Sequence, residues 1–142
     1  MIAAGAVLMV LAGMTAFGGE SKSGSGDFTL EGAKWLLTEI KGEEIGGIET
    51  IPFINFDREK KSAGGNTGCN VFGGNYEVLA GDKIRLYDTI STMRACIEDD
   101  RMDVERGFMS GLQNANRYEI KGKTLKLFRD KELLLEFRGE KK

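Results

Sequence analysis

Short apolar runs, in which polar residues occupy alternate positions, recur along most of the chain after residue 28. Runs of this length and alternation are typical of half-buried β-strands, and the Gly, Asp, Asn and Lys clusters between them are typical of turns. Pro52 stands near the start of one run, a position that an edge strand or the first residue of a strand tolerates. The pattern predicts an antiparallel meander with strands at residues 35–40, 51–56, 76–79, 83–87, 90–96, 118–120, 124–128 and 133–137.

The period of the apolar positions changes between Glu98 and Ala115. Val104, Phe108 and Leu112 recur there at helical spacing, behind acidic residues that suit a helix N-terminus. We expect one helix of about four turns. Seven to eight short strands and one helix predict an α+β domain, in which a small curled antiparallel sheet, partly open and β-barrel-like, packs on the apolar face of the helix.

The N-terminal segment has a different composition. Residues 2–19 carry no charge and are apolar and small, as in the hydrophobic part of a secretory signal, whereas glycines make them marginal as a membrane span. The four residues ending at Met14 resemble a bacterial lipobox in which Met14 stands at the place of the acylated cysteine, and a thioether cannot be acylated as that thiol is. We expect an export signal at residues 1–19, a lipoprotein origin, a flexible tether at 20–27 and one domain at 28–142.

Charge and chemistry exclude several classes of function. The 20 basic and 22 acidic residues are interspersed, so the sequence predicts no extended positive electrostatic potential that would hold nucleic acid or an anionic membrane surface. Histidine is absent, which removes the commonest general base and metal ligand. The 2 cysteines are too few for a structural zinc site and leave either one disulfide or two buried thiols. We expect that the protein is not an enzyme and binds neither a cofactor nor a metal. We expect it to contact a membrane only through its N-terminal segment.

The glycine-rich residues 63–76 form the most unusual segment. Such composition suits a tight crossing with positive φ angles and close backbone approach, in which Asn70 caps or bridges the turn. A phosphate-binding loop is the alternative, but the following Lys-Ser/Thr and a helix are missing. Residues 98–103 could be read as a calcium loop, although helix capping accounts for them. The methionines at 93, 102 and 109 fit core filling better than Cu(I) binding.

Three motifs, in order, resemble the META domain family, which includes the heat shock protein HslJ. Residues 32–42 (GAKWLLTEIKG) resemble its opening tryptophan strand, residues 68–76 (GCNVFGGNY) its GCNxFxGxY core, and residues 92–96 (TMRAC) its TMxAC strand. The following helix and last hairpin also match, so the resemblance covers about residues 28–138. It implies structural roles for Trp35, Gly68, Asn70, Phe72, Gly74, Tyr76, Thr92, Met93 and Ala95.

The resemblance also implies a disulfide bond and a location in the cell envelope. The family pairs the segments of Cys69 and Cys96, and an exported protein is expected to be oxidised, which favours a disulfide between them. Buried thiols remain the alternative, and a redox role has only Arg94 as weak support. The resemblance further implies a bacterial envelope setting and links to heat-shock or antibiotic stress and, in trypanosomatid members, to virulence, and it implies no known reaction.

Two functions follow as hypotheses. The first is a monomeric, non-catalytic module of the cell envelope, in the periplasm or anchored to the membrane, that binds a protein or envelope component during stress. An exposed apolar patch would favour it. The alternative is a small-ligand carrier that uses the sheet interior or the barrel mouth. An interior filled by Trp35, Phe53, Phe72 and Leu125, with no cavity left, would exclude the carrier.

Overall fold

The computed structural model describes residues 26–94, 96 and 99–142. The predicted export signal, and the predicted tether up to residue 25, lie outside the described residues. In chain order the elements are β1 (Ala33–Ile40), β2 (Glu43–Glu44), β3 (Phe53–Asp57), β4 (Ser62–Asn66), β5 (Val71–Val78), β6 (Ile84–Ser91), α1 (Asp99–Asn114), β7 (Arg117–Lys121), β8 (Thr124–Arg129) and β9 (Glu132–Lys141).

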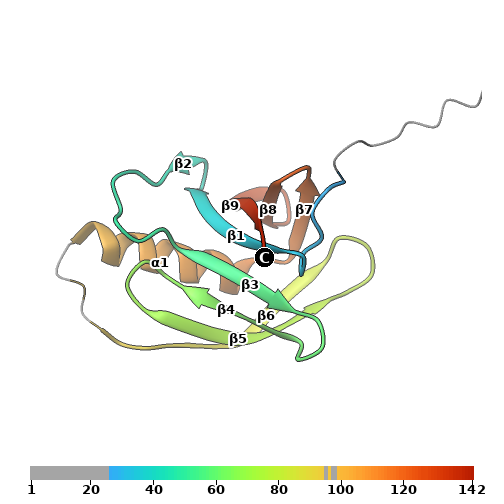
Figure 1. Cartoon of the computed structure of the whole chain (residues 1–142), viewed down its shortest axis with the longest axis horizontal. Coiled ribbons are helices and arrows are strands. Elements are labelled where there is room, and N and C mark those ends of the chain that lie inside the picture. The colour runs from blue at the N-terminus through green and yellow to red at the C-terminus, as the bar shows by residue number, and fades with distance from the viewer. Residues whose placement is uncertain (1–25, 95, 97–98) are drawn as a thin grey trace, which may run out of the picture.

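The strands form one curled antiparallel sheet, ordered β6-β5-β4-β3-β1-β9-β8-β7, with the two-residue β2 beside β1 (Figure 1). The outermost strands meet where β6 and β7 begin. The Ile84 amide donates to the Asn116 carbonyl at 3.1 Å, and the Tyr118 amide donates to the Asp82 carbonyl at 2.9 Å. The sheet is therefore a partly open barrel with one helix, which confirms the predicted α+β class.

Helix α1 packs against one end of this barrel. The Phe108 ring meets the rings of Phe72 and Phe137 edge to face, with centroids 5.4 Å and 6.1 Å apart. Gly111 lets the helix approach the sheet, since an added Cβ would lie 2.6 Å from Leu135 Cγ. This end of the barrel is filled.

The barrel interior is packed along most of its length. Trp35 and Leu125 are fully buried, Phe72 is buried, and the Trp35 indole N–H donates to the Leu30 carbonyl at 2.8 Å. Phe53, the fourth residue of the filling that would exclude a carrier, is only half-buried and has Lys34 over its ring. Among the described residues, the barrel keeps room for a ligand at the end away from α1.

The glycine-rich segment differs from its expected form. It was predicted as a tight crossing with positive φ angles, but most of it forms strands β4 and β5, and only Gly68 among its glycines has a positive φ, of 92°. The predicted close approach is present: a Cβ on Gly65 would collide with the Phe53 carbonyl oxygen. The glycines at 64, 65, 73 and 74 let β3, β4 and β5 pair without side-chain clashes, so they belong to the sheet, whereas Gly68 lies in the turn between β4 and β5.

A second difference concerns the strand expected at residues 90–96. Strand β6 instead continues from the expected strand at 83–87 to Ser91, and residues 92–94 are irregular. The physical reason is a side chain: the Arg94 amide donates to Asn70 Oδ1 at 2.8 Å and not to a neighbouring strand. Pro52 also lies outside its expected strand, because β3 begins at Phe53.

We predict that Gly111→Ala lowers the free energy of unfolding by about 1–3 kcal/mol, because the added methyl overpacks the fully buried Leu135. Helix propensity alone predicts the opposite sign, a gain of about 1 kcal/mol. Urea unfolding followed by circular dichroism measures the difference. Ser110→Ala, at an exposed position of the same helix, is the control and should change stability little. A Gly111→Ala variant more stable than the parent would contradict the tight packing of α1.

Candidate functional site

The side chain of Asn70 joins three segments that are far apart in the sequence. Its amide nitrogen donates to Glu105 Oε1 on α1 at 2.8 Å and to the Arg94 carbonyl at 3.3 Å. Its amide oxygen accepts from the Thr92 hydroxyl at 2.9 Å and from the Arg94 amide at 2.8 Å. Asn70 is buried, so these bonds replace the water that it loses on folding.

The turn that presents Asn70 is stabilised from within. The Thr67 hydroxyl is buried and accepts from the backbone N–H of Asn70 at 2.8 Å. The backbone N–H of Thr67 in turn donates to the backbone carbonyl of Asn70 at 2.8 Å. Beside this turn Cys69 and Cys96 form a disulfide, with Cα atoms 6.0 Å apart. The disulfide implied by the motif resemblance is thus present, and it attaches the start of the helical segment to the turn.

The remaining motif residues occupy different places in the fold. Trp35, Phe72 and Tyr76 are core residues, and Gly74 lies in β5, where an added Cβ would approach Thr89. Met93, by contrast, is 97% exposed and so does not fill the core as expected. Ala95 lies outside the described residues.

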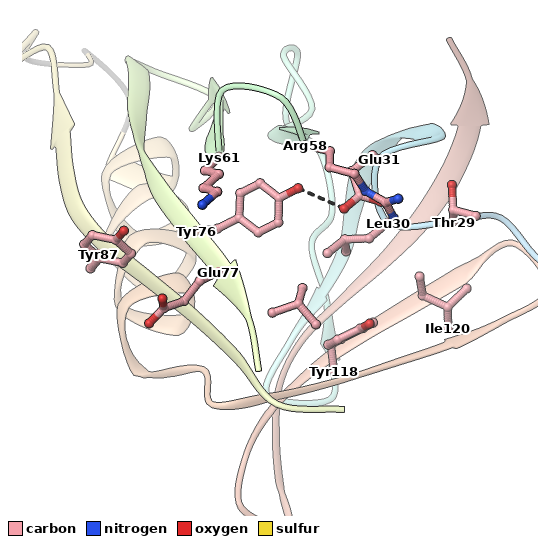
Figure 2. Close-up of a pocket in the computed structure, with 11 residues that line it drawn as sticks. Thr29, Leu30, Glu31, Arg58, Lys61, Tyr76, Glu77, Tyr87, Tyr118 and Ile120 are labelled. Carbon is pink, nitrogen blue, oxygen red and sulfur yellow. Dashed lines mark hydrogen bonds and ion pairs between the residues drawn. The ribbon is translucent and has the colours of Figure 1, made fainter. Parts of the chain in front are cut away.

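A hollow of about 760 Å³ opens at the end of the barrel away from α1; we call it the mouth (Figure 2). Residues from the segment before β1, the β3–β4 turn, β5, β6 and β7 surround it. Tyr118 and Ile120 pair with Leu127 and Leu125, so by strand alternation they face the barrel interior. The mouth is lined by Thr29, Leu30, Glu31, Arg58, Lys61, Tyr76, Glu77, Val78, Tyr87, Tyr118 and Ile120.

A polar pair lies at the wall of the mouth. The Tyr76 hydroxyl donates to Glu31 Oε1 at 2.9 Å, and Arg58 lies 3.4 Å from Glu31 Oε2. Burial raises the pKa of Tyr76, and the bond to Glu31 raises it further, so the phenol stays protonated. Burial alone would raise the pKa of Glu31, but the hydrogen bonds from Tyr76 and its own backbone amide, together with Arg58, lower it below its ordinary value.

Apolar side chains are also exposed on the outer face of β5 and β6. Val71 is 62% exposed and Ile90 is 77% exposed, and both border a shallow hollow over these strands. The register pairs Ile90 with Gly73, two residues from Val71, so the two side chains are diagonal neighbours on one face. We call Val71 and Ile90 the outer patch.

The described part of the chain offers neither a metal site nor a membrane-spanning helix. Residues 26–94, 96 and 99–142 contain no group of three acidic, cysteine or histidine side chains that could hold a metal ion. Within the same residues no helix has both the length and the apolar character needed to cross a membrane.

The META domain family matches residues 28–142. The chain belongs to the META domain family. This confirms the family resemblance and places the match on the predicted domain; a specific relation to HslJ stays a prediction.

Solved structures share the fold of this META domain. A protein from Burkholderia xenovorans, solved by NMR, is 18% identical, with a TM-score of 0.64, over 80% of this chain and 85% of that one. A crystal structure of a DUF4847 family protein from Bacteroides vulgatus ATCC 8482 is 15% identical, with a TM-score of 0.59, over 80% of this chain and 96% of that one. A search of the curated proteins found no match.

Sequence reasoning identified Tyr76 but missed most of the mouth of this META domain. Glu31, Arg58 and Tyr118 lie outside the motifs, in segments with unremarkable composition. The available signal was the alternation of residues 118–120, which places Tyr118 and Ile120 on one face of a strand. Which face turns inward depended on the pairing of β7 with β8.

We predict that Asn70→Ala lowers the free energy of unfolding by about 2–4 kcal/mol, because several buried hydrogen bonds are lost and the Arg94 amide is left unpaired. Urea unfolding of the oxidised protein measures the loss. Asn75→Ala, on strand β5, is the matched control, since the described residues give the Asn75 side chain no hydrogen bond. Equal effects of the two substitutions would contradict the proposed importance of the Asn70 bonds.

The Glu31–Tyr76 pair predicts a pH-dependent part of stability. Because folding lowers the pKa of Glu31, its contribution is complete above the unfolded pKa, near 4.5, and is lost as the pH falls through the lower folded pKa. Glu31→Gln should therefore lower the urea midpoint at pH 7, and the difference from the parent protein should shrink as the pH falls through the folded pKa of Glu31, below 4.5. Glu59→Gln, an exposed change on the nearby turn, is the control. A pH-independent difference for Glu31→Gln would refute this assignment.

Proposed function

We propose that this META domain is a non-catalytic module of the cell envelope that binds a small ligand in the mouth. The observation that carries the proposal is the shape of the barrel: α1 and the core fill one end and the interior, whereas a hollow of about 760 Å³ remains at the other end. Ligand pockets have volumes of about 300–1,000 Å³. Of the two functions expected from the sequence, the carrier that uses the barrel mouth is the better supported.

The residues around the mouth favour binding over catalysis. Glu31, which lines the mouth, is held ionised by Tyr76 and Arg58, and Tyr76 is held protonated. Neither side chain is therefore poised to exchange a proton near neutral pH. The absence of histidine from the sequence points the same way. The mouth offers an apolar surface with polar groups at its edge, which is the composition of a binding site.

The envelope location is also part of the proposal. It is supported by the uncharged apolar stretch at residues 2–19 and by the disulfide, since disulfides persist in oxidising compartments outside the cytoplasm. A role in stress, a lipoprotein origin and a monomeric state rest on the family resemblance and the lipobox-like segment. Recovery of the native protein from the cytoplasmic fraction, with both thiols free, would contradict the location.

A second candidate function has its own observation. The outer patch, Val71 and Ile90, exposes apolar side chains at the start of β5 and the end of β6, apart from the residues that line the mouth, which favours binding of a protein partner. This is the first hypothesis drawn from the sequence. The two functions use different residues and can be separated by mutation.

We predict that N-phenyl-1-naphthylamine, a neutral apolar fluorophore, binds the folded protein and that Ile120→Trp abolishes this binding by filling the mouth. Fluorescence titration measures the affinity, and circular dichroism checks the fold. Val71→Ser/Ile90→Ser is the control and should leave the affinity unchanged. Binding that survives Ile120→Trp and is lost in the control would reject the mouth in favour of the outer patch.

A further inference from the structure

The charges around the mouth are not evenly available to a ligand. Arg58 and Lys61 both come from the turn between β3 and β4, and Figure 2 shows Lys61 above Tyr76 on the left and Arg58 above it on the right, beside Glu31, with Tyr118 and Ile120 below. One wall of the mouth, formed by the β3–β4 turn, is therefore cationic, and another, formed by β7, is apolar and aromatic. A ligand that contacts both walls must itself be amphiphilic.

The two acidic side chains of the mouth are already engaged. Glu31 accepts from Tyr76 at 2.9 Å through one oxygen and lies 3.4 Å from Arg58 through the other. Glu77 pairs with Arg85 at 3.5 Å. The negative charge of each is therefore offset by a cationic partner within the protein.

The basic side chains retain unused donors. The Arg58 side chain is 81% exposed and directs a single nitrogen to Glu31, although a guanidinium carries five N–H donors. Lys61 is exposed and has no ion pair or side-chain hydrogen bond within the described residues. The unsatisfied hydrogen-bonding capacity on this wall consists of positively charged donors, which a carboxylate, sulfonate or phosphate would satisfy.

We propose that the mouth binds small amphiphilic anions: Arg58 and Lys61 hold the anionic group, and Tyr76, Tyr118 and Ile120 contact the apolar or aromatic body. This inference rests on the proposed function and names its ligand class. The fully packed region around Trp35 and Phe108 limits how deep the ligand enters. The anionic group therefore remains near the rim, where both cations are exposed.

The test compares two fluorophores of similar shape on the folded protein. 1-Anilinonaphthalene-8-sulfonate carries a sulfonate, whereas N-phenyl-1-naphthylamine is neutral. Arg58→Ala/Lys61→Ala should weaken binding of the sulfonate by about fivefold to tenfold and leave the neutral affinity within about twofold. Added salt should weaken only the sulfonate. Lys60→Ala/Lys131→Ala removes the same charge at exposed positions outside the mouth and should change neither affinity.

The outcomes separate this inference from the proposed function. Equal effects of Arg58→Ala/Lys61→Ala on both fluorophores, or none on either, would overturn the anion preference and leave the mouth as a binding site. Failure of both fluorophores to bind the parent protein would overturn both proposals. Unchanged neutral binding by the double variant also shows that it is folded.

A further arm identifies where such an anion comes from. Laurate that displaces the bound sulfonate would support a single-chain ligand taken from solution. Flotation of the protein with phosphatidylglycerol vesicles, lost in Arg58→Ala/Lys61→Ala, would support an anionic lipid headgroup presented by a membrane. If laurate does not displace the sulfonate and the vesicles do not bind the protein, the amphiphile inference is contradicted.

Discussion

The packing of α1 against one end of the curled sheet decides which end of the barrel is filled by side chains and which end keeps a hollow. Phe108 lies against Phe72 and Phe137, and Gly111 brings the helix close enough to cover Leu135. A sheet whose outer strands meet only near their starts cannot close by its own hydrogen bonds. The helix supplies the missing apolar surface at one end, and the other end keeps a mouth.

The most distinctive motif serves this packing. Asn70, presented by the turn at residues 67–70, hydrogen-bonds Thr92, Arg94 and Glu105, and so connects β5, the segment after β6 and α1. The disulfide between Cys69 and Cys96 adds a covalent link at the same place. The glycines of β4 and β5 permit the close strand pairing around it. We therefore interpret the motif as the connection that places α1, and not as a site of chemistry.

The mouth lies at the other end of the barrel, where the side chains leave a hollow unfilled. Tyr76 links the two regions, because its ring packs edge to face on Phe56 in the core while its hydroxyl bonds Glu31 at the mouth. This arrangement leaves Arg58 and Lys61 exposed above an aromatic wall. An amphiphilic anion is the ligand class that fits this distribution of charge and apolar surface, and binding is the function that requires no further chemistry from these residues.

The sequence by itself determined the family, the α+β class, helix α1 at nearly its observed bounds and most strands, because local apolar periodicity and ordered motifs carry that information. Tertiary structure decided the rest. Strand β4 lacks a strand-like pattern and exists because Gly64 and Gly65 fit between β3 and β5, and residues 92–94 are held by a side chain instead of a strand. The mouth assembles Glu31, Arg58, Tyr76 and Tyr118 from segments that only the curl of the sheet brings together, and no local pattern encodes that meeting.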